Sequence, residues 1–200
     1  MIYQYDDNAS WLAIVAAVFV VEIATIVVIR PISANSRVWY KNFGIVSVIA
    51  DVGIILLDFA VSRYMFSAYP SSTYSPWVNA TIFSATLLWL QIVHDLLYYH
   101  VFIRLSIRLK STNGIVLFMR QYGSDGKVWP VFGDSVMVVA SGILAHALSL
   151  KSAHVSATVL ISALYIVPYM VCSEFIVRDP PAEIPTRAVK AEGSKNLLKW

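Results

Sequence analysis

The stretch WLAIVAAVFVVEIATIVVI at residues 11–29 decides the fold, because its only charged residue is Glu22. A helix needs about 20 apolar residues to cross the roughly 30 Å hydrocarbon core of a bilayer, and this stretch has that length. It is too long for the apolar core of a signal peptide, and acidic residues precede it where a signal peptide has basic ones. We therefore expect a transmembrane helix that the protein retains.

The composition of the whole chain agrees with a membrane protein. Of its 200 residues, 58% are hydrophobic and 14% are charged, whereas about a quarter of the residues in soluble domains are charged. A soluble fold of this length would expose much of that apolar surface to water. The single cysteine, Cys172, excludes an intrachain disulfide and a metal site built from cysteines.

Four more apolar stretches are long enough to cross a bilayer, so we predict an all-α integral membrane protein with about five transmembrane helices in one bundle over residues 1–176. The expected spans are residues 11–29, 44–66, 77–103, 131–150 and 154–176. Short sequence similarities between the second and fourth spans, and between the third and fifth, also allow a duplicated two-helix hairpin with one added helix.

The basic residues predict the orientation of the bundle. Thirteen of the 15 lysine and arginine residues lie within residues 30–41, 104–127 and 178–199. With five spans these segments share one side of the membrane, and the positive-inside rule then predicts the N-terminus outside and the C-terminus inside. Trp39 and Tyr40 are among several aromatic residues at segment ends, where such rings favour the headgroup zone.

Two segments outside the spans carry much of this charge. Residues 104–129 alternate basic and apolar residues, so they form either a basic surface loop or a helix lying in the membrane interface. Residues 177–200 are rich in proline and basic residues, which favours an extended tail over another helix. The tail residues expected to bind a partner are Arg178, Pro180, Pro181, Arg187, Lys190, Lys195 and Trp200.

Several titratable residues fall inside the predicted spans. A charged residue at the bilayer centre is costly and is therefore a candidate for function. The rise of 1.5 Å per residue puts the acids of the second, third and fourth spans at similar depths, so we expect an intramembrane polar cluster, mostly in the inner third. Its members are Asp51, Asp58, His94, Asp95 and Asp134, with Asp58 and Glu22 nearer the middle of the membrane.

This cluster allows three interpretations: interhelical hydrogen bonds that fix the packing, a proton or ion path, and a carboxylate–imidazole metal site. We favour packing, because no two histidines have the four-residue spacing of a tight metal-binding pair. We also predict no catalytic residue, no metal and no cofactor. Adjacent residues on a helix point about 100° apart, so His94 and Asp95 are not expected to face one small ligand.

Several strings in the chain resemble a family of uncharacterised multi-span membrane proteins of nucleocytoplasmic large DNA viruses, the chlorovirus-like giant viruses of algae and protists. The resemblance covers roughly residues 39–169. It rests on WYKNFG at 39–44, VIADV at 48–52, QIVHDLLY at 91–98, GDSVM at 133–137 and LYIVPY at 164–169. The resemblance implies no catalytic activity, but it implies a virus with an internal membrane beneath its capsid.

In that context the chain is expected to be a structural or assembly protein and not an enzyme. It would lie in the virion inner membrane, derived from host endoplasmic reticulum, and link that membrane to capsid or minor capsid proteins through its tail. The other expected partners are the lipid bilayer and further copies of the chain, with no sequence-specific nucleic acid. The alternatives are a small channel or transporter for protons or ions that uses the intramembrane Asp and His residues, and then a membrane-embedded metalloenzyme.

Overall fold

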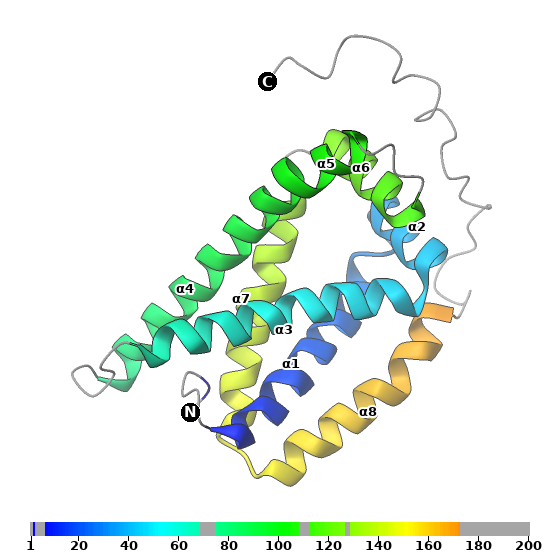
Figure 1. Cartoon of the computed structure of the whole chain (residues 1–200). Helices are drawn as coiled ribbons and strands as arrows, with labels where there is room; N and C mark the ends of the chain where they lie inside the picture. The colour runs from blue at the N-terminus through cyan, green and yellow to red at the C-terminus, as the bar shows by residue number, and fades with distance from the viewer. Residues whose placement is uncertain (1, 3–6, 69–74, 109–112, 127–128, 173–200) are drawn as a thin grey trace.

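The computed structural model describes residue 2 and residues 7–68, 75–108, 113–126 and 129–172, and in these residues it contains helices and no strand. Five long helices dominate (Figure 1): α1 (Asn8–Val28), α3 (Ile45–Ser67), α4 (Pro76–Leu97), α7 (Trp129–Ser149) and α8 (Ala153–Cys172). The predicted all-α fold with five helices long and apolar enough to span a membrane is confirmed. The predicted partner-binding tail and the last residues of the fifth predicted span lie outside the described residues.

Short helices connect the spans at one end of the bundle. α2 (Ala34–Phe43) lies between α1 and α3, and a π-helix, η2 (Tyr98–Ile103), joins α4 to α5 (Arg104–Arg108). α6 (Gly114–Gly126) precedes α7 and occupies half of the segment predicted to be a surface loop or an interfacial helix. We call this end the basic end, because Lys41, Arg104 and Arg108 are exposed there, and we call the opposite end the loop end.

The helix boundaries have local causes. The Ser33 side chain accepts a hydrogen bond from the Ser36 N–H (3.2 Å), which caps the start of α2. Gly44 then turns the chain from α2 into α3 with φ of 55°, a conformation that favours glycine. Ser75 caps α4 by accepting from the Val78 N–H at 3.4 Å. Ser33 and Gly44 explain why a separate helix stands between the first two spans, where only a connection was predicted.

The third span is longer than expected. Helical structure continues from Val78 through η2 to Arg108, which is 31 residues. At 1.5 Å per residue this segment measures about 46 Å, which exceeds the hydrocarbon thickness, so it tilts or projects beyond the membrane at the basic end.

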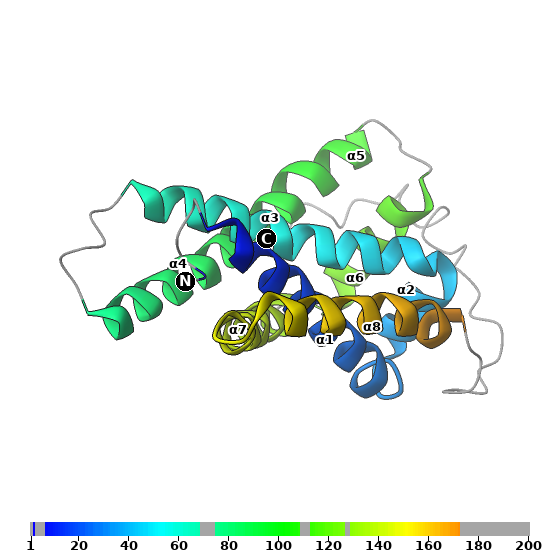
Figure 2. The same cartoon turned by 90° about the horizontal axis from the view of Figure 1, so that it is seen from below.

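α1 is the central helix of the bundle. It packs mainly against α7 and α8, and it also contacts α3 (Figures 1 and 2). Ala13, Ala16 and Ala17 are buried on α1, and such small residues let neighbouring helices approach closely. α3 packs on α4, whereas α7 and α8 contact each other less than each contacts α1, so the two halves of the predicted duplication pack differently.

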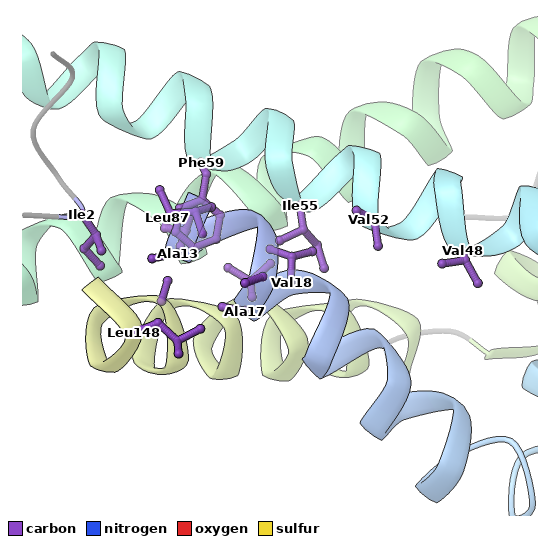
Figure 3. Close-up of a cluster of buried hydrophobic side chains, with 14 of the residues drawn as sticks. Ile2, Ala13, Ala17, Val18, Val48, Val52, Ile55, Phe59, Leu87 and Leu148 are labelled. Carbon is purple, nitrogen blue, oxygen red and sulfur yellow. The ribbon is translucent and has the colours of Figure 1, made fainter. Parts of the chain in front are cut away.

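An apolar core fills the half of the bundle near the loop end. Figure 3 shows Phe59 of α3 next to Leu87 of α4, with Val18 of α1 and Ile55 of α3 close together further along. The ring of Phe83 lies 6.2 Å from that of Phe59 and 5.8 Å from that of Phe66, measured between centroids. Buried polar residues lie in both halves: Arg63 and Ser62 near the loop end, and Glu22 and Gln91 nearer the basic end.

Candidate functional site

A tyrosine from α2 bridges two buried carboxyl groups. Glu22 of α1 is fully buried, and the Tyr40 hydroxyl donates a hydrogen bond to its Oε1 at 2.9 Å. The same hydroxyl lies 3.3 Å from Oδ2 of Asp51 on α3, and the Trp39 Nε1–H donates to that Oδ2 at 2.9 Å. The start of α2 at Ser33 and the turn at Gly44 carry Trp39 and Tyr40 into this position between α1 and α3.

The hydrogen atoms at this bridge can be counted. A tyrosine hydroxyl has one hydrogen to donate, and an ionised carboxylate has none. Tyr40 keeps its hydrogen, because burial and the charges of Glu22 and Asp51 raise the pKa of the phenol. Full hydrogen bonds from Tyr40 to both carboxyl groups therefore require a proton on Glu22 or Asp51. The low dielectric between the helices also disfavours two ionised carboxylates at this separation.

A second polar group lies on α4. The Gln91 side-chain N–H donates to Oδ1 of Asp95 at 2.8 Å, and Nδ1 of His94 is 3.5 Å from the same oxygen. Asp58 of α3 is close enough to interact electrostatically with His94 and Asp95. The Cα–Cβ bonds of adjacent helical residues point about 100° apart, and rotation about the side-chain bonds brings the polar atoms of His94 and Asp95 close to each other. That the two residues do not face one small ligand stays a prediction.

Asp134 of α7 joins the two groups. It lies within electrostatic range of Asp51 and Asp58 on α3 and of His94 and Asp95 on α4. The structure thus brings all five predicted cluster residues into one neighbourhood on three helices. We call these five residues, together with Glu22, Gln91 and Tyr40, the carboxyl cluster.

Three residues of this neighbourhood were not among the predicted site residues: Trp39, Tyr40 and Tyr122. Trp39 and Tyr40 were expected in the headgroup zone, because an aromatic residue at the end of a span usually lies there. Ser33 as a helix cap ahead of these aromatic residues, and Gly44 four residues after Tyr40, were the signals of a short helix between the two spans.

Aromatic side chains of α2 and α6 cover the carboxyl cluster at the basic end. The ring of Phe118 stacks on Trp39, with centroids 5.2 Å apart, and on Tyr122, 5.8 Å apart. Phe43 packs edge-on against Phe118 at 5.8 Å. We call Trp39, Phe43, Phe118 and Tyr122 the aromatic cover, and it joins α2 to α6 beside the buried acids.

Several buried oxygen atoms of the cluster have no hydrogen-bond partner in the described part of the chain. They are Oε2 of Glu22, Oδ2 of Asp58, Oε1 of Gln91 and Oδ2 of Asp95. Residues that serve only to hold helices together are expected to satisfy their hydrogen-bonding groups, since an unpaired buried polar group costs stability. Protons or water molecules would supply the missing partners. Among the described residues no group of three or more His, Cys, Asp or Glu side chains is arranged to hold a metal ion.

Tyr122 provides a titration that reports on the cover. Burial, followed by the charges of Asp134, Asp51 and Asp95, raises the pKa of this phenol to about 12. Phenolate absorbance is titrated in the wild type and in a Tyr122→Phe variant, and the difference between the two curves belongs to Tyr122. We expect this difference to develop near pH 12, about two units above an ordinary tyrosine. A difference curve centred near pH 10 would contradict the position of Tyr122 beside the acids.

Comparisons with protein-family models, with curated proteins and with solved structures found no match to this chain. The functional conclusion therefore depends on the geometry of the carboxyl cluster.

Proposed function

We propose that this multi-pass membrane protein is a small proton channel or proton-coupled transporter, and that the carboxyl cluster binds the proton. The observation that supports the proposal is the Tyr40 hydroxyl between Glu22 and Asp51, at 2.9 and 3.3 Å. A proton on either acid can pass through the hydroxyl, which gives its own hydrogen to one carboxyl group as it receives one from the other. The interaction therefore transfers a proton between α1 and α3 without net movement of the side chains.

The rest of the cluster extends this relay. Asp51 and Asp58 lie on one face of α3, seven residues and about 10 Å apart. Asp134 interacts with both, and Asp95 and His94 lie within range of Asp58. An imidazole accepts and releases protons near neutral pH, so His94 suits the end of such a series.

The two ends of the bundle differ in how they close the cluster. The aromatic cover separates it from the basic end, which the positive-inside rule assigns to the cytoplasmic side in this proposal. Toward the loop end the fully buried rings of Phe59 and Phe83 and the side chain of Leu87 form an apolar barrier. Phe43, Phe118 and Tyr122 of the cover are only half-buried, whereas the barrier residues are fully buried. We infer that a proton reaches the cluster past the cover at the basic end, and that release toward the loop end requires water or a helix movement.

A structural role in a virion membrane stays a prediction beside this proposal. Its contact surface is the tail, which lies outside the described residues. A protein of a viral inner membrane can also transfer protons, so the two roles are compatible.

Proton flux into liposomes tests the proposal. Purified protein is reconstituted with a pH-sensitive dye inside the vesicles, and a potassium diffusion potential drives protons inward. Wild-type protein is expected to acidify the interior faster than protein-free vesicles do. Tyr40→Phe removes only the bridging hydroxyl, and we expect it to lower the initial rate about a hundredfold, the lower end of the range for losing a proton-transfer group.

Tyr64→Phe is the matched control, because Tyr64 lies on the loop-end half of α3 and is 67% exposed. It is expected to leave the flux unchanged. A wild-type rate equal to that of protein-free vesicles would overturn the proposed function. A Tyr40→Phe rate equal to that of the wild type would remove the tyrosine bridge from the proton route.

A further inference from the structure

One face of α8 carries hydroxyl groups that no other part of the described chain covers. The buried face of this helix, which includes Ser156, Ala163, Val167 and Val171, packs mainly on α1. α8 lies at the edge of the bundle (Figures 1 and 2), and its outer side is open to lipid. The exposed polar residues on that side are Thr158, Ser162, Tyr165 and Tyr169, which we call the hydroxyl stripe. Their spacing of four, three and four residues places them on one face.

The stripe reaches the middle of the membrane-spanning helix. Ser162 is close to the midpoint of Ala153–Cys172, and Tyr165 is 67% exposed. Helical side chains lean toward the N-terminus of their helix, so the Tyr165 hydroxyl leans toward the middle of α8 and away from its nearer end. Tyr169 lies near the end of the helix, as interfacial tyrosines usually do, but that preference does not account for Ser162 or Tyr165.

The Thr158 hydroxyl donates to the backbone carbonyl of His154 at 2.9 Å, but other hydrogen-bonding groups on this face lack partners within the described residues. Tyr169 donates to the Tyr165 hydroxyl at 3.4 Å, which leaves the hydrogen of Tyr165 without an acceptor there. Pro168 lies inside α8 and has no N–H, so the carbonyl of Leu164, four residues earlier on the exposed side, loses its usual donor. Hydrocarbon cannot supply these hydrogen bonds, and in membranes such groups are usually satisfied by a neighbouring helix.

We propose that two copies of this chain associate in the bilayer through the hydroxyl stripe of α8. The stripe contains donors and acceptors on the same face, so it complements itself across a two-fold axis. Ser162 is small, and small residues allow two helices to approach closely where they cross. The spacing of four, three and four residues also matches the seam of helices that pair at a shallow left-handed angle. This inference is independent of the proposed proton transfer.

Disulfide crosslinking gives a direct test. The native Cys172 is exposed and follows Tyr169 by three residues, so it continues the stripe and is first replaced by alanine. In this Cys172→Ala background, Ser162→Cys and Tyr165→Cys are compared with the controls Leu164→Cys and Ile166→Cys. The control residues are 47% and 40% exposed in the wild type but point about 100° away from Tyr165. Oxidation in liposomes is expected to link stripe positions into dimers several times more efficiently than the controls. Equal yields at all four positions, or no dimers, would overturn the proposal.

A second measurement does not depend on cysteines. Single-molecule photobleaching in bilayers counts the copies in each complex as the protein-to-lipid ratio is varied. Ser162→Leu combined with Tyr165→Leu is expected to raise the dimer dissociation constant about tenfold or more, since interhelical hydrogen bonds in membranes contribute up to about 1–2 kcal/mol. A wild-type protein that is monomeric at every ratio would overturn the proposal.

Discussion

Proton flux through a Glu22→Gln/Asp51→Asn double variant is expected to fall to the level of protein-free vesicles. Both substitutions keep a carbonyl oxygen that can accept from the Tyr40 hydroxyl and from the Trp39 N–H, which now hold Glu22 Oε1 and Asp51 Oδ2 at 2.9 Å. Neither amide can take up and release a proton at physiological pH. The double variant should therefore retain the packing of α1, α2 and α3 while it loses both acids of the bridge.

Acid-preserving exchanges provide the control for that experiment. Glu22→Asp and Asp51→Glu keep a titratable group and change only its reach, so each is expected to retain measurable flux. Infrared spectroscopy tests the proton count separately from transport. The wild-type protein should show a protonated-carboxyl band near neutral pH that weakens in the double variant. Undiminished flux in the double variant would exclude these two acids from the route, and an unchanged band would exclude the shared proton.

The same residues also explain why the acids are tolerated in a membrane. A single acid in the middle of a helix costs roughly 2.5–3.5 kcal/mol to insert, and five isolated ones would be prohibitive. Here Tyr40, Trp39 and Gln91 donate hydrogen bonds to three of them. Glu22, Asp58 and Asp95 each keep one oxygen atom without a hydrogen-bond partner in the described part of the chain, where a proton or a water molecule would supply the partner.

The sequence alone predicts the five long helices because a span needs only length and apolar composition, which are local properties. The stretch at residues 11–29 and the observed α1 differ by a few residues at each end. The continuation of the third span to Arg108 was missed because residues 104–108 contain two arginines. Hydropathy shows where a helix leaves the membrane, but it does not show whether the helix ends there or continues into water.

The candidate site was harder to predict than the fold. Depth along each helix grouped Asp51, His94, Asp95 and Asp134, because the rise per residue is constant. The bridge at Tyr40 depends on how α2 folds back against α1 and α3, and no periodicity within one span contains that information. A tyrosine at the end of a span has two ordinary positions, in the headgroups or in the bundle, and only the tertiary packing decides between them.

The buried arginine at the loop end leads to the largest predicted effect on stability. Arg63 of α3 is fully buried, its Nη2 donates to the backbone carbonyl of Asp7 at 2.9 Å, and its guanidinium carbon lies 4.6 Å from the centroid of the Trp11 ring. The Asp7 side chain accepts from the Ser10 N–H at 3.3 Å and caps α1. Arg63 therefore fixes the start of the central helix to α3.

We expect Arg63→Ala to lower the free energy of unfolding by about 3 kcal/mol. A charged hydrogen bond contributes roughly 1.5–3 kcal/mol, a desolvated cation–π contact adds about 1–2 kcal/mol, and relaxation around the shortened side chain recovers part of the loss. Unfolding in mixed detergent and sodium dodecyl sulfate micelles measures the change. Hydrogen exchange should also accelerate at the amides of residues 8–12, since the first turn of α1 loses its attachment.

One further variant at position 63 separates charge from geometry, and one at an exposed arginine elsewhere serves as a control. Arg63→Lys keeps the charge but lacks the planar guanidinium that can reach the carbonyl and stack on an indole together, so its loss of stability is expected to be intermediate. Arg104→Ala removes an exposed arginine at the basic end and should change stability by less than about 0.5 kcal/mol. If Arg63→Ala were as mild as Arg104→Ala, the attachment of α1 would have to come from the small-residue packing on α7 and α8 instead of from Arg63.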